Sequence, residues 1–284
     1  MGERRFRFGL TSGMVADMAA WTASARQAES LGYSTFLIPD TLSTPAPIPA
    51  LAAAAAVTST LRVGTWVLCD PLRNPRTTAW EVASVDRLSG GRFELGIGAG
   101  RPGAENDARR LGIEYGTPGQ RVARLAESVR TIKQVLSGQE DGFPQAAQRP
   151  HPPILIAASG PKLLALAARE ANIVAFGLAP DTTEDAAQQR IDLVRDAAPD
   201  RFDDLELATG LIAIGEGDYP WLRRVGTDVQ TLAESGAITV LIGTPREMAD
   251  TLQCRRDRLG LSYLTVPAAA AEKFAPVVAA LSGR

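Results

Sequence analysis

The sequence predicts an α/β protein, a (β/α)8 barrel, that forms a single domain over residues 1–284. Three observations predict this fold. Strand-like and helix-like segments alternate along the chain, eight strand segments are each followed by a helix, and no change in composition marks a domain boundary. Strands that alternate with helices pair in parallel, because each helix returns the chain to the same end of the sheet. Eight such units close into a barrel.

Short apolar runs bounded by turn residues predict the strands. These runs are residues 6–11, 33–38, 61–69, 92–97, 153–158, 173–176, 205–214 and 261–266. Helices are predicted over residues 17–31, 75–89, 118–136, 161–171, 245–259 and 269–281. Two more helices are predicted to end at about residues 59 and 197. The helix at 118–136 has one apolar face, since its apolar residues recur at steps of three and four. Residues 139–152 and 215–243 lack such patterns, and one further helix is predicted at 219–235.

Composition excludes several classes of protein. The formal net charge of −2 offers no basic excess for nucleic acid or an anionic membrane. The first residues lack the apolar core of a signal peptide, and no apolar run reaches the length of a membrane span. Cys69 and Cys254 are too few for a disulfide framework, and no spacing resembles a metal site. We therefore expect a cytoplasmic protein without metal, nucleic acid or membrane partners.

The strongest candidate for a functional site is the segment 88–103, LSGGRFELGIGAGRPG. A buried strand runs there into glycines at alternate positions, Gly96, Gly98 and Gly100. Glycine has no Cβ and tolerates positive φ, so these positions would let backbone amides approach a flat or anionic ligand. The C-terminal ends of barrel strands are where such folds carry their chemistry. The segment also matches G-x-G-x-x-G, but Pro102 interrupts the helix start that a dinucleotide-binding fold requires.

Other loops at the same barrel end carry further candidates. Asp40 and Asp70 each fit either a turn carboxylate or a ligand contact. Cys69 fits a core position at a strand end better than a nucleophile, because no histidine lies near it in sequence. Ser159 and Gly160 precede a helix whose first amides could bind a phosphate, although an ordinary helix start has the same pattern. The single histidine, His151, lies before a strand at the opposite end, so we expect it to be structural.

Three stretches resemble the luciferase-like monooxygenase superfamily, particularly its oxidoreductases that use the deazaflavin coenzyme F420. They are LRVGTWVLCDPLRNPRTTAWEVASVDRLSGGRFELGIGAGRPG, PPILIAASGPKLLALAAREANIV and VLIGTPREMADTLQCRRDRLGLSYLTV. The resemblance implies a luciferase-like barrel with the cofactor ring at the C-terminal strand ends. It also implies a non-prolyl cis peptide after the third strand, around residues 69–70. The ring and its side chain would contact Asp40, Cys69, Asp70, Gly98, Ala99 and Gly100, and the phosphate would contact Ala158, Ser159 and Gly160.

The chain departs from familiar members at two positions. Thr41 stands where many F420 enzymes have a histidine, and Arg101 stands where the sugar-phosphate dehydrogenases have a glutamate. We therefore expect hydride transfer between F420 and a small organic substrate, with catalytic Asp40 or Arg101 polarising the substrate. Two alternatives remain: an FMN-dependent monooxygenase of the same fold, and a barrel that binds the cofactor without catalysis. The resemblance also implies a homodimer.

Overall fold

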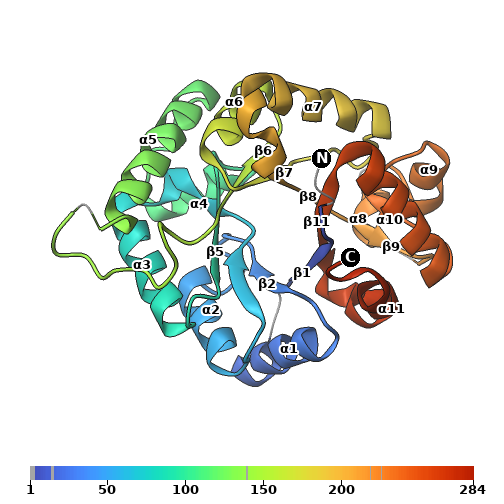
Figure 1. Ribbon diagram of the computed structural model, residues 1–284, viewed down its shortest axis with the longest axis horizontal. Coiled ribbons are helices and arrows are strands. Elements are labelled where there is room, and N and C mark those ends of the chain that lie inside the picture. Colours follow the sequence, from blue (N-terminus) through green and yellow to red (C-terminus); the bar gives the residue numbers. More distant parts are fainter. Residues whose placement is uncertain (1–3, 14–15, 139, 218, 225) are drawn as a thin grey trace.

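The computed structural model describes residues 4–13, 16–138, 140–217, 219–224 and 226–284. In these residues, nine strands form one closed parallel sheet in the order β3-β2-β1-β11-β8-β7-β6-β5-β4, and a β3–β5 pairing completes the circle. Figure 1 views the molecule along the barrel, with the helices arranged around the outside. The predicted (β/α)8 barrel of luciferase-like type is confirmed.

The strands of the barrel are β1 (Arg7–Thr11), β2 (Thr35–Ile38), β3 (Arg62–Thr65), β4 (Leu68–Cys69), β5 (Phe93–Gly98), β6 (Ile154–Ala158), β7 (Ile173–Phe176), β8 (Glu206–Gly210) and β11 (Leu261–Pro267). A small separate sheet joins β9 (Ala213–Ile214) to β10 (Val240–Leu241). The α-helices are α1 (Met18–Ser30), α2 (Pro47–Ala56), α3 (Pro75–Leu88), α4 (Ala104–Leu111), α5 (Pro118–Leu136), α6 (Pro161–Glu170), α7 (Glu184–Ala197), α8 (Pro220–Arg224), α9 (Val229–Glu234), α10 (Pro245–Leu259) and α11 (Ala271–Leu281). Short 3₁₀ turns are η1 (Asp70–Leu72), η2 (Pro199–Asp204) and η3 (Ala268–Ala270).

The third predicted strand is divided into β3 and β4 by a cis peptide between Trp66 and Val67. The expected position at residues 69–70 is therefore wrong by three residues. The reason lies in the neighbouring strand, where a Cβ at Gly96 would lie 2.0 Å from the carbonyl oxygen of Thr65. Thr65 Oγ1 also donates to Gly96 O at 2.6 Å and accepts from Gly96 N at 2.9 Å. These contacts end the regular ladder at Thr65, so the chain departs from it at the next two residues.

Two other segments differ from the prediction. The seventh strand, predicted at 205–214, is divided because the chain leaves the barrel after β8, and β9 pairs with β10 instead. The helix predicted at 219–235 is two short helices, α8 and α9, separated by a turn in which Gly226 has φ +81°. Residue 225 of that prediction lies outside the described residues. The same holds for residue 139 of the segment 139–152, residue 218 of the segment 215–243 and residues 1–3. The sequence patterns also missed α4 and β10.

The core has a layer between barrel and helices and a smaller cluster inside the barrel. The inner cluster contains Leu37, Leu155, Ile173, Ala175, Ala208 and Tyr263. Below it, at the N-terminal ends of the strands, the buried carboxylate of Glu94 lies between Arg7 and Arg62, with contacts of 2.6 and 2.5 Å. Burial raises the pKa of Glu94, but the two arginines outweigh burial and lower it. This end of the barrel is filled, which leaves the C-terminal strand ends for a ligand.

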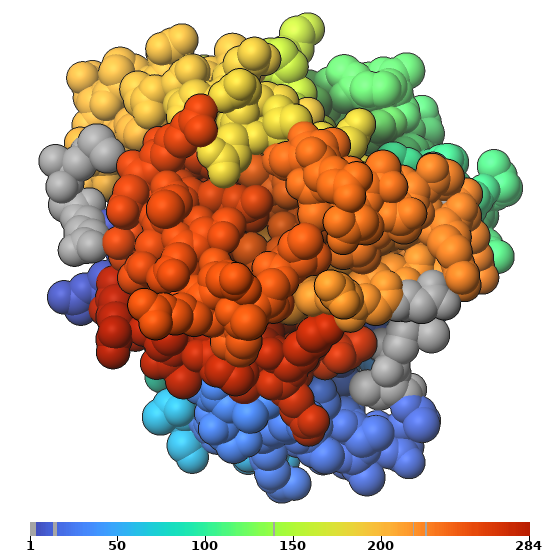
Figure 2. Space-filling view, turned by 90° about the vertical axis from the view of Figure 1, so that its right-hand side faces the viewer, coloured from blue at the N-terminus to red at the C-terminus, as the bar shows by residue number. Residues whose placement is uncertain are grey.

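The C-terminal segments, from β9 to α11, cover one side of the barrel, where they form the orange and red surface of Figure 2. Phe6, near the start of the described residues, forms a β-bridge with Ser282 near the C-terminus. Over the described part of the chain, every helix is too short or too polar to cross a bilayer.

Candidate functional site

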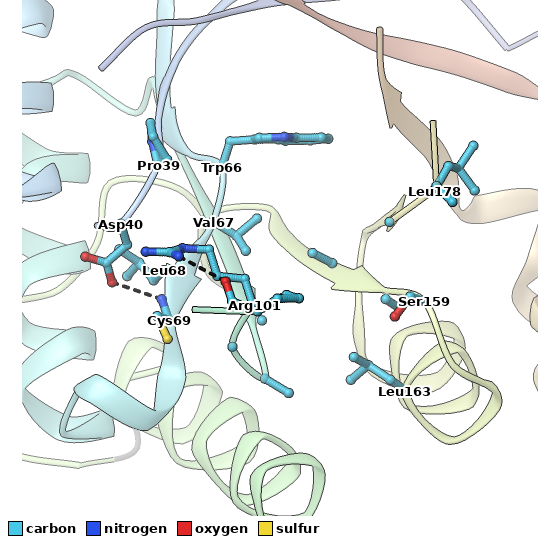
Figure 3. Close-up of a pocket in the computed structure, with 18 residues that line it drawn as sticks. Pro39, Asp40, Trp66, Val67, Leu68, Cys69, Arg101, Ser159, Leu163 and Leu178 are labelled. Carbon is cyan, nitrogen blue, oxygen red and sulfur yellow. Dashed lines mark hydrogen bonds between the residues drawn. The ribbon is translucent and has the colours of Figure 1, made fainter. Parts of the chain in front are cut away.

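A cavity of about 460 Å³ opens at the C-terminal ends of β2, β4, β5, β6 and β7. Figure 3 shows Asp40, Cys69 and Arg101 on one side of it and Ser159, Leu163 and Leu178 on the other. Its lining is Pro39, Asp40, Trp66, Val67, Leu68, Cys69, Gly98, Ala99, Gly100, Arg101, Pro102, Ala157, Ala158, Ser159, Leu163, Gly177, Leu178 and Ala179. The glycine-rich strand and the Ser159 loop, far apart in sequence, thus face one cavity.

Trp66 and Val67 lie between β3 and β4, where the chain leaves the regular ladder, and are called the Trp66–Val67 bulge here. This bulge forms an apolar surface of the cavity. The indole of Trp66 extends across it (Figure 3) and meets the ring of Tyr263 edge-on, with centroids 6.3 Å apart. Gly98 lies against Val67, since a Cβ at Gly98 would be 3.1 Å from Val67 Cγ2. Gly96 and Gly98 therefore make room for the bulge of the chain. Gly96, Gly98 and Gly100 were all expected to allow the direct approach of a ligand. This is corrected for Gly96, since only Gly98 and Gly100 of the three line the cavity.

Asp40 is held by Arg73, an arginine that is not among the predicted site residues. Its Oδ2 accepts from Arg73 Nε at 2.7 Å and its Oδ1 from Arg73 Nη2 at 2.8 Å. Oδ2 also accepts from the backbone N–H of Cys69 at 2.9 Å. Burial lowers the pKa of Arg73, but the hydrogen bonds and charge of Asp40 outweigh it and raise that pKa. The carboxylate thus fixes the end of β4 beside the bulge.

Cys69 and Asp70 are placed differently. Cys69 lines the cavity with a buried thiol, and burial, reinforced by Asp40, raises its pKa to about 11. The group is therefore a thiol at neutral pH, as the interpretation of Cys69 as a core residue predicted. Asp70 is buried outside the cavity lining, and burial raises its pKa, although Ser128 and Arg124 act in the opposite direction. The nearest cation is Arg124 Nε, 3.8 Å from Oδ2.

The loop after β5 is fixed by two further residues. Tyr115 donates its hydroxyl to the carbonyl of Arg101 at 3.0 Å, directly beside Gly100, whose φ is +94°. Arg121 donates to the carbonyl of Ala99 at 2.9 Å, and its guanidinium lies 4.3 Å from the centroid of the Tyr115 ring. An arginine in the first turn of a helix opposes the helix dipole. That unfavourable position was the one signal by which the sequence could have identified Arg121.

Arg101 extends from this loop at the mouth of the cavity. Its Nη2 donates to Asp107 Oδ2 at 2.6 Å and its Nη1 to the carbonyl of Pro102 at 3.2 Å, while 44% of the side chain stays exposed. Because arginine keeps its charge at any ordinary pH, Arg101 can polarise an oxygen but cannot exchange a proton.

The opposite wall is formed by the loop before α6. Ala158 and Ser159 line the cavity, whereas Gly160 is the N-cap of α6 and lies just outside the lining. Among the described residues, the Ser159 hydroxyl has no hydrogen-bond partner. Pro161 at the first helical position has no N–H, and the amides of Leu163 and Leu164 donate to the carbonyl of Gly160 at 3.0 and 2.9 Å. Among the described residues, the amide of Lys162 is therefore the first-turn N–H of α6 without a backbone partner. The hydroxyl and the helix end together form a potential anion site.

His151 lies away from the cavity, and no metal site is found among the described residues. His151 lies before β6, at the opposite barrel end, where its Nδ1 is 2.8 Å from the carbonyl of Pro152. Burial, together with Lys133, lowers its pKa despite that contact. In the ranges that the structure covers, no group of three or more His, Cys, Asp or Glu side chains could hold a metal ion.

Curated relatives share roughly half of their length with the chain. An F420-dependent glucose-6-phosphate dehydrogenase of Beutenbergia cavernae is 34% identical over 173 residues, covering 54% of this chain and 50% of that protein. A 5,10-methylenetetrahydromethanopterin reductase of Methanolobus tindarius is 29% identical over 153 residues, covering 50% of this chain and 45% of that protein. The chain spans about half the length of the curated relatives it matches.

Two solved structures resemble the whole chain. The coenzyme F420 dependent tetrahydromethanopterin reductase from Methanopyrus kandleri aligns with a TM-score of 0.76 and 18% identity over 98% of each chain. The monooxygenase RslO1 from Streptomyces bottropensis aligns with a TM-score of 0.72 and 22% identity over 96% of each chain. At these identities the likeness concerns the fold. The sequence profile of the luciferase-like monooxygenases matches residues 5–218, and the chain belongs to this family.

Proposed function

We propose that the protein is an oxidoreductase that transfers a hydride between coenzyme F420 and a small organic substrate. The observation that carries the proposal is the shared cavity of the β5 glycines and the Ser159 loop, at the C-terminal end of the barrel. Names of relatives in the same family support it, since the dehydrogenase of Beutenbergia cavernae is F420-dependent. F420 would supply a ring carbon that exchanges a hydride, while the protein supplies binding and orientation.

The residues of the cavity suit a flat tricyclic ring with a phosphate on its side chain. A volume of about 460 Å³ is within the range of ligand cavities, and apolar side chains dominate the walls. The ring would lie on the Trp66–Val67 bulge, next to Asp40 and Cys69, with Leu178 on the opposite side. Its side chain would pass Gly98, Ala99 and Gly100. The phosphate would be bound by Ala158, Ser159 and Gly160 at the N-terminus of α6.

In this arrangement Asp40 and Arg101 act differently. All the hydrogen bonds of Asp40 go to Arg73 and the Cys69 amide, so its role is to place the backbone under the ring. Arg101 extends at the mouth and would polarise the substrate oxygen, stabilising the charge that develops there as the hydride moves. Asp70, buried beside Ser128, would support the loop from below and not touch the ring.

The second candidate is an FMN-dependent monooxygenase of the same fold. This candidate is supported by the fold, which resembles a monooxygenase at a TM-score of 0.72 about as well as an F420-dependent reductase at 0.76. Both cofactors have a tricyclic ring and a phosphate, so the same cavity suits either. A barrel that binds the cofactor without turnover is the third possibility.

Parallel titrations with F420 and FMN, followed by difference absorbance, test the proposal. We expect a red-shifted or sharpened band with F420 at micromolar concentration and weaker binding of FMN. Ser159→Asp places a negative charge at the phosphate site, and Ser159→Asn is its neutral control of the same size. F420 affinity should fall at least tenfold in the Asp variant and little in the Asn variant, since a like charge costs more than 1.4 kcal/mol at about 4 Å in a protein environment.

Three other results would change the assignment. Tighter binding of FMN with NAD(P)H-dependent oxygen consumption would identify the monooxygenase instead. Tight binding of reduced F420 without turnover of a broad panel of acceptors would identify the non-catalytic barrel. Binding of neither cofactor would overturn the proposal.

The homodimer and the cytoplasmic location remain proposals. On α3, Trp80 and Leu88 expose 56% and 78% of their surface, and a homodimer would be expected to cover such side chains. Light scattering should give twice the mass of the chain, and the double variant Trp80→Glu, Leu88→Glu should give a monomer. A monomeric wild-type protein would contradict this.

A further inference from the structure

A second cavity, of about 530 Å³, opens beside the candidate cofactor site. It is lined by Ser43, Arg101, Gly103, Asn106, Asp107, Arg109 and Arg110. Arg101 belongs to the lining of both cavities, so the two adjoin at this side chain. Most of the second cavity comes from α4, a helix that no sequence pattern predicted.

The second cavity is strongly basic, whereas the first is mostly apolar. Its lining has three arginines against one aspartate, a net charge of +2. Arg101 donates from Nη2 to Asp107 Oδ2 at 2.6 Å, and Arg109 donates from Nη1 to Asn106 Oδ1 at 3.1 Å. Arg110 has no ion pair or hydrogen bond to any side chain that the structure describes. Like charges gathered around an empty volume repel one another, so an anion there would relieve the repulsion.

The donors of this cavity match one kind of group. The planar guanidinium binds carboxylate and phosphate through two parallel N–H bonds, which makes arginine the preferred residue for these anions. Asn106 and the hydroxyl of Ser43 provide neutral donors at the same rim. Ser43 is itself held by Thr41, whose hydroxyl oxygen lies 2.8 Å from that of Ser43. Thr41 thus supports the rim of the basic cavity.

We propose that this basic cavity binds a carboxylate or phosphate of a ligand whose reacting part lies in the adjoining cavity. This proposal rests on the proposed function and adds one property of the bound molecule, namely an anionic group on the Arg101 side. Two sources share this chemistry, namely the substrate itself and the anionic tail of the cofactor. The tests below separate them.

The first experiment detects the anion without any cofactor. Arginine Nε–H resonances of the apoprotein are followed by NMR during titration with inorganic phosphate and with succinate at constant ionic strength. The variants Arg109→Ala and Arg110→Ala assign the two signals. Both signals should shift with a saturating curve. In the double variant Arg109→Ala, Arg110→Ala, the Nε–H signal of Arg101, the third arginine of the lining, reports binding, and the anion affinity should fall about tenfold, as expected for the loss of charged hydrogen bonds. Arg246→Ala, an exposed arginine of α10, removes one charge elsewhere and should leave the affinity unchanged.

The second experiment identifies the source of the anion with the complete enzyme. F420 with its oligoglutamate tail and F420 from which the tail has been removed are titrated against wild type and the double variant. A loss of affinity for the tailed form alone assigns the cavity to the cofactor tail. Unchanged F420 affinity, together with a KM about tenfold higher for hydroxy acids than in wild type but unchanged for neutral alcohols, assigns it to the substrate.

Outcomes that overturn the inference are distinct from those that overturn the proposed function. Arg109 and Arg110 signals that do not respond to either anion in wild type, or an Arg101 signal that responds equally in wild type and the double variant, would reject the basic cavity while F420 binding could still succeed. Failure of F420 to bind wild type would reject the proposed function, while the apoprotein titration would still report on the cavity.

Discussion

The carboxylate of Asp40 and the guanidinium of Arg73 form a two-point ion pair, with contacts of 2.7 and 2.8 Å, at the edge of the candidate cofactor cavity. The side chains are 11% and 20% exposed, so solvent screens the pair only in part. The same carboxylate binds the amide of Cys69, which follows the Trp66–Val67 bulge. Through this pair, the loop after β2 and the loop after β4 form one rigid wall.

Removal of Arg73 should therefore weaken both stability and binding. Arg73→Met leaves a partly buried carboxylate without its partner, which should lower the free energy of unfolding by about 3 kcal/mol. Urea denaturation measures this. The double variant Asp40→Asn, Arg73→Met removes both charges and should recover at least half of the loss. Equal losses in the single and double variants would show that the ion pair itself contributes little.

The clamp on the β5 loop gives a second prediction. Tyr115→Phe removes only the hydroxyl that donates to Arg101 O, so stability should fall by about 1 kcal/mol. Cofactor affinity should fall several-fold, because Ala99, Gly100 and Arg101 would lose one of their two anchors. Tyr219→Phe is the matched control, since its hydroxyl binds the backbone of Ile214, away from the cavity lining. Equal loss of cofactor affinity in both variants would contradict the clamp.

Two glycines should respond to alanine in opposite ways. A Cβ at Gly96 would lie 2.0 Å from Thr65 O, whereas a Cβ at Gly160 meets no heavy atom within 4 Å. Gly96→Ala should lower stability by more than about 2 kcal/mol, because the backbone must move. Gly160→Ala should fold normally and report only on the approach of the phosphate, through F420 affinity. Normal stability of Gly96→Ala would contradict the close approach of β3 and β5.

Glu29 gives a prediction for pH. Its carboxylate accepts backbone N–H bonds from Ser59, Thr60 and Leu61, and these bonds lower its pKa from 4.5 to about 2. A group with a lowered pKa in the folded state contributes stability above its unfolded pKa and loses it as the pH falls through the folded value. The stability difference between wild type and Glu29→Gln should therefore be full above about pH 5 and vanish toward pH 2. A difference that does not change over this range, measured by urea unfolding, would contradict it.

Local patterns predicted most of the fold because apolar runs and glycine or proline turns mark barrel strands and helices directly. The helix at 118–136 needs no tertiary information, since Leu125, Val129 and Ile132 lie on one buried face. The cis peptide at 66–67 was misplaced because it follows the end of β3, and the close approach of Thr65 to Gly96 of another strand at that point is not visible in the local sequence. Helix α4 was missed because polar residues fill most of its short length, leaving no extended apolar face to detect.

In the candidate site too, some residues could be predicted from local sequence and others could not. Glycines and the Ser159 loop could be identified from sequence, because strand ends and helix starts are local features. Arg73, Tyr115 and Arg121 could not, since each acts on a backbone segment contributed by another loop. The prediction that Asp40 is a catalytic group likewise did not include its partner Arg73, which lies 33 residues further along the chain.

A crystal structure of the protein with F420 would show whether the cofactor binds in the cavity shared by the β5 glycines and the Ser159 loop. We expect a ring stacked on the Trp66–Val67 bulge, with its phosphate within hydrogen-bond distance of the Ser159 hydroxyl and the N-terminus of α6. Density for the cofactor outside this cavity, or a phosphate remote from Ser159, would contradict it.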